Sequence, residues 1–129
     1  MIRTMTRYNP DTGPVAAEWL ALDEGERVSV VERYHTAEGI AHPQPKLHAT
    51  IHTVVENQLA LNEVAVVETL QRLQQEGLSR HDAVHAIGTV VVEHIMAAFK
   101  AKAESGPALT TQYFHRLKQL TAEEWRRMA

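Results

Sequence analysis

Histidines are the residues of this chain best suited to carry chemistry. The 129-residue sequence contains eight histidines and no cysteine. Without cysteine there are no disulfides, thiolate nucleophiles or thiolate-bound metal clusters, so any metal must be held by nitrogen and oxygen. Because neutral imidazole is the commonest nitrogen ligand in proteins, the positions of the histidines decide whether a metal site is predicted.

Two pairs of histidines have the spacing of a single helix face. His48 and His52 are four residues apart, and so are His81 and His85. Successive helical residues turn by about 100°, so side chains four residues apart lie nearly above one another. Each pair falls on the apolar side of its predicted helix. That side also carries Ile51, Val55 and Leu59 in the helix of His48, and Val84, Val92, Ile95 and Phe99 in the helix of His81.

Further donors lie on the apolar sides of the predicted helices. Glu32 and His35 form an E-x-x-H pair, and Glu56 lies at the edge of the face that carries His52. A single buried histidine is usually a core residue with a satisfied hydrogen bond. Several buried imidazoles without partners would each cost about 1 to 3 kcal/mol, a cost that metal coordination removes. The predicted metal ligands are therefore His48, His52, His81, His85, Glu56, Glu32 and His35.

The elements that position these residues are predicted to be helices throughout. Gly39, Asn62 and Gly77 interrupt the helical pattern, and no run of residues has the alternation of a strand. The sequence predicts an all-α protein, a small bundle of about four core helices with short N-terminal and C-terminal helices. Residues 1–13 are predicted to form an extended arm, residues 105–129 a helical tail, and the other helices span about 14–22, 23–37, 45–61, 63–76 and 80–104.

The order of these helices predicts that the donors meet. The second helix ends just after His35 and the third begins just before His48, so a short antiparallel connection brings the two residues to the same level. The fourth helix returns the chain, and the fifth is then expected to run parallel to the third. His81 and His85 lie in the first turns of the fifth helix, so all three pairs should reach one end of the bundle.

Composition limits the class of protein. With 44% hydrophobic and 22% charged residues, a chain of this length is expected to fold as a single domain over residues 1–129. A net charge of −3 and scattered basic residues argue against a nucleic-acid partner. The sequence has no uninterrupted apolar run of about 20 residues and no apolar signal core at its start, so no membrane association and a cytoplasmic location are expected.

Two segments also resemble a known family. The pattern LHxxxHxxxExQ followed by HxxxH is similar to that of short bacterial proteins known only as a domain of unknown function, and the match covers about residues 45–95. The resemblance implies a helical, histidine-rich protein without an established activity. That family has two further carboxylates after the second histidine pair; this chain keeps Glu93 but has Thr89 at the nearer position. The matching residues are Leu47, His48, His52, Glu56, Gln58, His81 and His85.

Several functions fit these patterns. The first is a non-haem iron or dinuclear metal site for binding or redox chemistry of a small molecule such as dioxygen, with iron, zinc or manganese as the metal. The second is a structural zinc site or a protein-interaction module without catalysis. The third, based on the pair His81-Asp82, is an HD-like phosphohydrolase, which also needs a later aspartate that this chain lacks. The expected partners are a metal ion and a small molecule, and the sequence leaves open whether Glu93 is a ligand and whether the chain forms a homo-oligomer.

Overall fold

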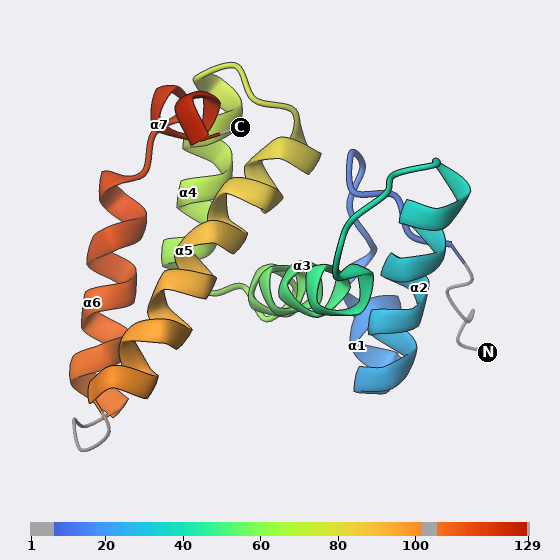
Figure 1. Cartoon of the computed structure of the whole chain (residues 1–129), viewed down its shortest axis with the longest axis horizontal. Helices are drawn as coiled ribbons and strands as arrows, with labels where there is room; N and C mark the ends of the chain where they lie inside the picture. Colours follow the sequence, from blue (N-terminus) through green and yellow to red (C-terminus); the bar gives the residue numbers. More distant parts are fainter. Residues whose placement is uncertain (1–6, 102–105, 129) are drawn as a thin grey trace.

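The computed structural model describes residues 7–101 and 106–128, and the described residues form helices and no strands (Figure 1). The predicted all-α class is confirmed. Residues 1–6 of the predicted arm and the predicted end of the fifth helix near Glu104 lie outside the described residues. The helices are α1 (Ala16–Ala21), α2 (Glu24–Ala37), α3 (Pro45–Ala60), α4 (Val64–Gln75), α5 (Arg80–Ala101), α6 (Gly106–Gln119) and α7 (Ala122–Met128).

Three helices end in the same way. Gly39, Asn62 and Gly77 have positive φ angles of 70°, 56° and 104°, the left-handed conformation that glycine and asparagine adopt most readily. In each case the next backbone N–H donates to a carbonyl five residues earlier, at distances of 2.9 to 3.1 Å. These bonds satisfy carbonyls that the helix end leaves unpaired, so the chain reverses where the sequence predicted.

The starts of the helices are fixed by side chains. The Asp23 carboxylate accepts the backbone N–H of Glu26, and the Glu26 carboxylate accepts that of Asp23, which is a complete capping box. At α5 the Ser79 hydroxyl accepts the backbone N–H of Asp82 at 3.1 Å. Pro45 occupies the first turn of α3, where its missing N–H costs nothing.

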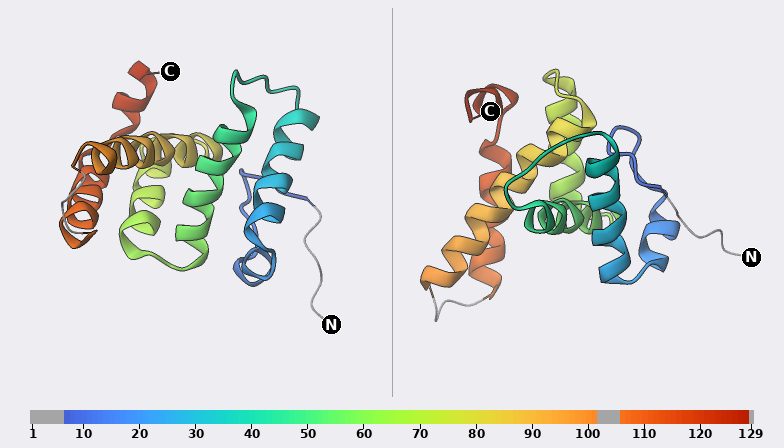
Figure 2. Two further views of the ribbon diagram at one scale, coloured as in Figure 1. Left: turned by 60° about the horizontal axis from the view of Figure 1, so that its bottom comes forward. Right: turned by 45° about the vertical axis from the view of Figure 1, so that its right-hand side comes forward.

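The helices are arranged on two sides of α3. On one side α2 lies beside α3 and runs in the opposite direction, as predicted (Figure 2). On the other side α4, α5 and α6 pack together (Figure 1). The predicted parallel course of α3 and α5 is wrong, because α5 crosses α3 steeply. The crossing is close: a Cβ atom on Gly88 would lie 3.2 Å from Ile51 Cγ2, so glycine lets the two helices approach.

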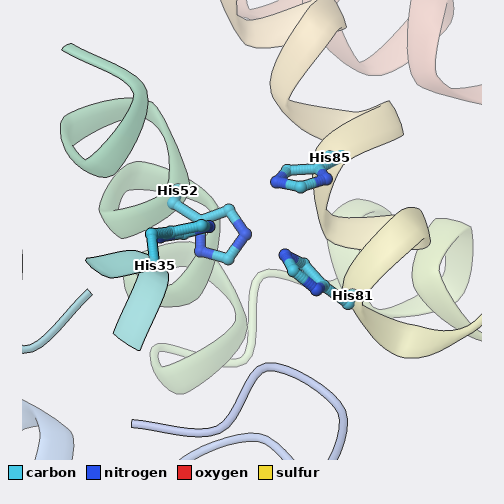
Figure 3. A group of neighbouring side chains, drawn as sticks. All are labelled: His35, His52, His81 and His85. Atoms are coloured by element: carbon cyan, nitrogen blue, oxygen red, sulfur yellow. The ribbon is translucent and has the colours of Figure 1, made fainter. Parts of the chain in front are cut away.

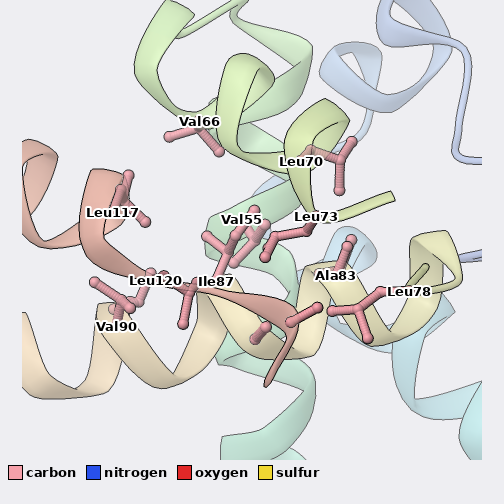
Figure 4. Packing of buried hydrophobic residues seen from close by; sticks show 14 of the residues in the cluster. Val55, Val66, Leu70, Leu73, Leu78, Ala83, Ile87, Val90, Leu117 and Leu120 are labelled. Atoms are coloured by element: carbon pink, nitrogen blue, oxygen red, sulfur yellow. The ribbon is translucent and has the colours of Figure 1, made fainter. Parts of the chain in front are cut away.

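Two apolar cores flank the crossing. The larger one, part of which is drawn in Figure 4, lies between α3, α4, α5 and α6 and includes Val55, Leu73, Ile87 and Leu117. The smaller one joins α1, α2 and α3 to the segment before α1, through Tyr8, Trp19 and Val31. The histidines of α2, α3 and α5 therefore lie between two packed regions.

Helix α5 combines length with an apolar composition. The segment Arg80–Lys100 is long and apolar enough to cross a membrane by length and composition, and 39% of its most apolar window is buried within the protein. The core helix of a soluble protein passes the same test, so this property alone assigns no membrane role.

Candidate metal centre

Five histidines from three helices converge where α2, α3 and α5 meet. His35 lies in the last turn of α2, His48 and His52 lie in the first half of α3, and His81 and His85 lie at the start of α5. Figure 3 shows His35 and His52 facing the two histidines of α5. One ring nitrogen from each of these four side chains lies within 4.8 Å of the others, so the group can hold a metal ion.

His48 joins this group through two short nitrogen contacts. Its Nε2 lies 3.3 Å from Nε2 of His35 and 3.2 Å from Nε2 of His85. A tetrahedral ion with bonds of 2.0 to 2.1 Å separates its nitrogen ligands by about 3.3 to 3.4 Å, so these contacts have the spacing of ligands that share one ion. We call His35, His48, His52, His81 and His85 the histidine cluster.

The proton on His35 is fixed by a backbone group. Its Nδ1 lies 2.9 Å from the carbonyl oxygen of Val31, and a carbonyl can only accept, so Nδ1 carries the hydrogen. Nε2 of His35 therefore carries no hydrogen, and its lone pair faces His48. Because Nε2 of His48 carries at most one hydrogen, it cannot form full hydrogen bonds to both neighbours, whereas a cation would accept all three lone pairs.

Two buried ring nitrogens have no hydrogen-bond partner. They are Nε2 of His52 and Nε2 of His81. His52 is 2% exposed, so water does not replace the missing partner of its ring. Leaving a buried polar atom unpaired costs about 1 to 3 kcal/mol, and a metal ion in the cluster would remove that cost for both rings.

A hydrogen-bonded relay orients His52 from behind. The Tyr8 hydroxyl lies 3.1 Å from Nδ1 of His52 and donates a short hydrogen bond to the Glu56 carboxylate. Because the Tyr8 hydrogen is used on Glu56, Nδ1 of His52 must donate to the Tyr8 oxygen, which leaves Nε2 as the free lone pair. Arg80 holds Glu56 with two hydrogen bonds of 2.8 and 2.9 Å and also donates to the carbonyl of Pro10 at 2.8 Å. Such partners behind a histidine ligand are typical of protein metal sites.

Burial keeps the histidine cluster neutral. Together with a smaller effect of the neighbouring imidazoles, it lowers the pKa of His48 to about 4 and that of His85 to about 3. Burial also lowers the pKa of His35 and His81, and that of His52 most strongly, because the protonated ring would lose its hydration. Neutral imidazole is the form that binds metals.

The carboxylates predicted as ligands lie elsewhere. Glu56 is buried, and its two oxygens are engaged by Arg80 and Tyr8. Glu32 is partly buried on α2 and lines surface depressions with Ser29 and Arg33, away from the grouped histidines. Glu93, which the sequence left open as a ligand, pairs with Arg116, at 3.0 Å between Oε2 and Nε. Among the described residues the structure therefore brings together the five predicted histidines and none of the predicted carboxylates.

Three residues near the site escaped prediction or were predicted only in part. Tyr8 lies in a segment without periodicity, and no sequence signal connects it to His52. Arg80 precedes His81 directly, but the sequence predicts its partner Glu56 as a metal ligand and not as one half of an ion pair. Trp125 of α7 is not among the predicted site residues, and the centre of its ring lies 6.2 Å from that of His85.

A small pocket opens onto the histidine cluster. Its volume is about 220 Å³, and it lies between the first turns of α3 and the middle of α5. Three histidines of the cluster form part of its wall. The other lining residues are His42, Leu47, Ile51, Val84, Gly88, Thr89 and Val92.

The fold and the site define the class of protein only broadly. The chain is an all-α protein with a buried histidine cluster that can hold a metal ion. No protein-family model matches the chain, and neither a curated protein nor a solved structure matches it.

Proposed function

We propose that this chain binds one transition-metal ion through the imidazoles of the histidine cluster. The observation that carries the proposal is the convergence of buried ring nitrogens: two of them have no partner, and the tautomers of His35 and His52 are set by the carbonyl of Val31 and the hydroxyl of Tyr8. Histidines that served only packing would be expected to pair through hydrogen bonds. Here Nε2 of His52 and Nε2 of His81 have no partner, and Nε2 of His48 lies 3.2 to 3.3 Å from two other ring nitrogens.

The donor set narrows the choice of metal. Imidazole suits iron, copper, nickel and zinc, whereas manganese prefers carboxylates, and Glu56, the predicted carboxylate ligand on α3, is already paired with Arg80. A dinuclear centre is disfavoured for the same reason, since the grouped donors among the described residues include no carboxylate to bridge two ions. We therefore favour a mononuclear non-haem site.

Within that class we favour iron with a position open to a small molecule. Structural zinc sites usually have four protein ligands and no access, whereas this cluster offers five nitrogens and adjoins a pocket. A structural zinc bound by His35, His52, His81 and His85 is the second candidate, because these four nitrogens already form a compact group. The resemblance of residues 45–95 to helical histidine-rich bacterial proteins agrees with either metal.

The HD-like hydrolase receives less support. Asp82 is exposed and its backbone N–H contributes to the start of α5, while the grouped metal donors of the described residues are all histidines. An HD centre needs carboxylate ligands beside its histidines.

Elemental analysis of protein purified without a histidine tag tests the proposal, together with an optical spectrum of the same sample. One equivalent of iron with ligand-to-metal absorption supports the favoured assignment. One equivalent of zinc supports the second candidate. No metal, and no uptake when iron or zinc is added, would refute both.

A further inference from the structure

We propose that the pocket beside the histidine cluster binds the apolar body of a small molecule whose single donor atom coordinates the metal. This inference rests on the proposed metal site and adds the chemical class of its ligand. It concerns one face of the cluster, the face formed by His48, His52 and His85.

The pocket wall offers apolar contact and almost no hydrogen bonds. Its aliphatic residues are Leu47, Ile51, Val84 and Val92. The hydroxyl hydrogen of Thr89 is already donated to the carbonyl of Ala86 at 2.6 Å. A ligand in this pocket would therefore find its polar partner at the metal and apolar surface around the rest of its body.

The pocket has few polar side chains outside the histidine cluster: they are Thr89 and the exposed His42, whose Nδ1 already accepts the backbone N–H of Gln44 at 3.0 Å. No lysine, arginine, aspartate or glutamate lines the pocket, as judged over the described residues. Against the aliphatic part of the wall, formed by Ile51, Val84 and Val92, a hydroxyl or carboxylate on the body of the ligand would lose its hydration without gaining a partner, which costs affinity. The site is thus expected to prefer a methyl group over a hydroxyl of the same size at the end of the ligand.

The size of the pocket limits the ligand. A volume of about 220 Å³ lies below the range of typical drug-sized sites, so a body of a few carbon atoms fits and a larger one reaches the rim. Gly88 contributes to this space, because a Cβ atom there would meet Ile51 Cγ2 at 3.2 Å. Leu47 and Val92 are 55% and 44% exposed, which places them at the entrance.

Alkanethiols bound to the cobalt(II)-loaded protein provide the test. A thiol that coordinates cobalt loses its proton and produces a sulfur-to-cobalt charge-transfer band, so titration yields a dissociation constant. From methanethiol to propanethiol the affinity is expected to rise about fourfold per methylene, the value for burying a CH₂ group. 2-Mercaptoethanol, which has a hydroxyl in place of the last methyl of propanethiol, should bind at least tenfold more weakly than propanethiol.

Thr89→Leu adds bulk to the pocket wall and removes no histidine of the cluster. This variant should still bind cobalt, but its affinity for alkanethiols should no longer rise with the length of the alkyl chain. Thr50→Leu, an exposed change on the outer side of α3, should behave as the wild type. If cobalt binds but affinity is independent of chain length, or if mercaptoethanol binds as well as propanethiol, the pocket proposal is wrong and the metal site stands. If the cluster takes up no cobalt, both proposals are wrong.

Discussion

The hydroxyl of Tyr8 lies 3.1 Å from Nδ1 of His52, although 44 positions separate the two residues in the sequence. This contact ties the segment before α1 to the interior of the site. It also sets the tautomer of His52, because the Tyr8 hydrogen is donated to Glu56. The N-terminal segment is therefore part of the proposed metal centre through one side chain.

Tyr8→Phe should weaken metal binding. The change removes the acceptor for the His52 N–H, and loss of a partner behind a histidine ligand typically costs about 10- to 100-fold in metal affinity. Competition with a chromophoric chelator measures this effect. Tyr113→Phe is the matched control, because its hydroxyl donates to Gln58 at 2.7 Å, and it should leave the affinity unchanged. Equal losses in both variants would show that the effect is not specific to His52.

Arg80→Gln should destabilise the fold. The Glu56 carboxylate is fully buried, and the change would leave its charge without a cation, which typically costs about 3 to 5 kcal/mol. Urea denaturation of metal-free protein measures the free energy of unfolding. Arg127→Gln, which breaks the exposed pair with Glu123, should change it by less than about 1 kcal/mol. A loss below about 1 kcal/mol for Arg80→Gln would contradict the role of this ion pair.

The double variant His52→Ala, His85→Ala should abolish stabilisation by metal. A ligand that binds only the folded state at 100 times its dissociation constant stabilises it by about 2.7 kcal/mol, so metal should raise the melting temperature of the wild type and not that of the variant. His94→Ala, His115→Ala removes two histidines outside the cluster and should retain the full rise. A rise in the cluster variant would place the ion elsewhere.

Acid should destabilise the metal-free protein. The folded protein lowers the pKa of His48 to about 4 and that of His85 to about 3, whereas the unfolded chain has ordinary histidine values near 6.5. Between these values the unfolded state binds more protons, so stability present above about pH 6.5 is lost as the pH falls toward 4 and 3. Melting temperatures from pH 7 to 4 measure the slope, which His48→Gln, His85→Gln should reduce. An unchanged slope in that variant would contradict the assignment.

Much of the fold follows from local patterns in the sequence. Gly39, Asn62 and Gly77 end helices because the left-handed conformation suits them, and the capping box at Asp23 starts α2. His35 and both histidine pairs lie on the apolar faces of their helices, so these side chains point inward when the helices pack. These features depend on neighbouring residues only, which is why they could be predicted.

The angle between α3 and α5 and the fate of the carboxylates could not be predicted in this way. The close approach at Gly88 and Ile51 is a tertiary contact, and neither it nor the crossing angle can be read from the length of a connection. Helical periodicity placed Glu56 at the edge of the face that carries His52, but it could not show that Glu56 would be buried or that Arg80 and Tyr8 would reach it. Both partners come from segments whose positions depend on the whole fold.

X-ray absorption spectroscopy of the zinc-loaded protein tests the central claim most directly. The spectrum reports the type and number of atoms bound to the ion and detects imidazole by its outer-shell scattering. We predict a first shell of four or five nitrogens at about 2.0 to 2.1 Å, all from histidine. A shell dominated by oxygen, or one with two or fewer imidazoles, would contradict a metal centre built from the histidine cluster.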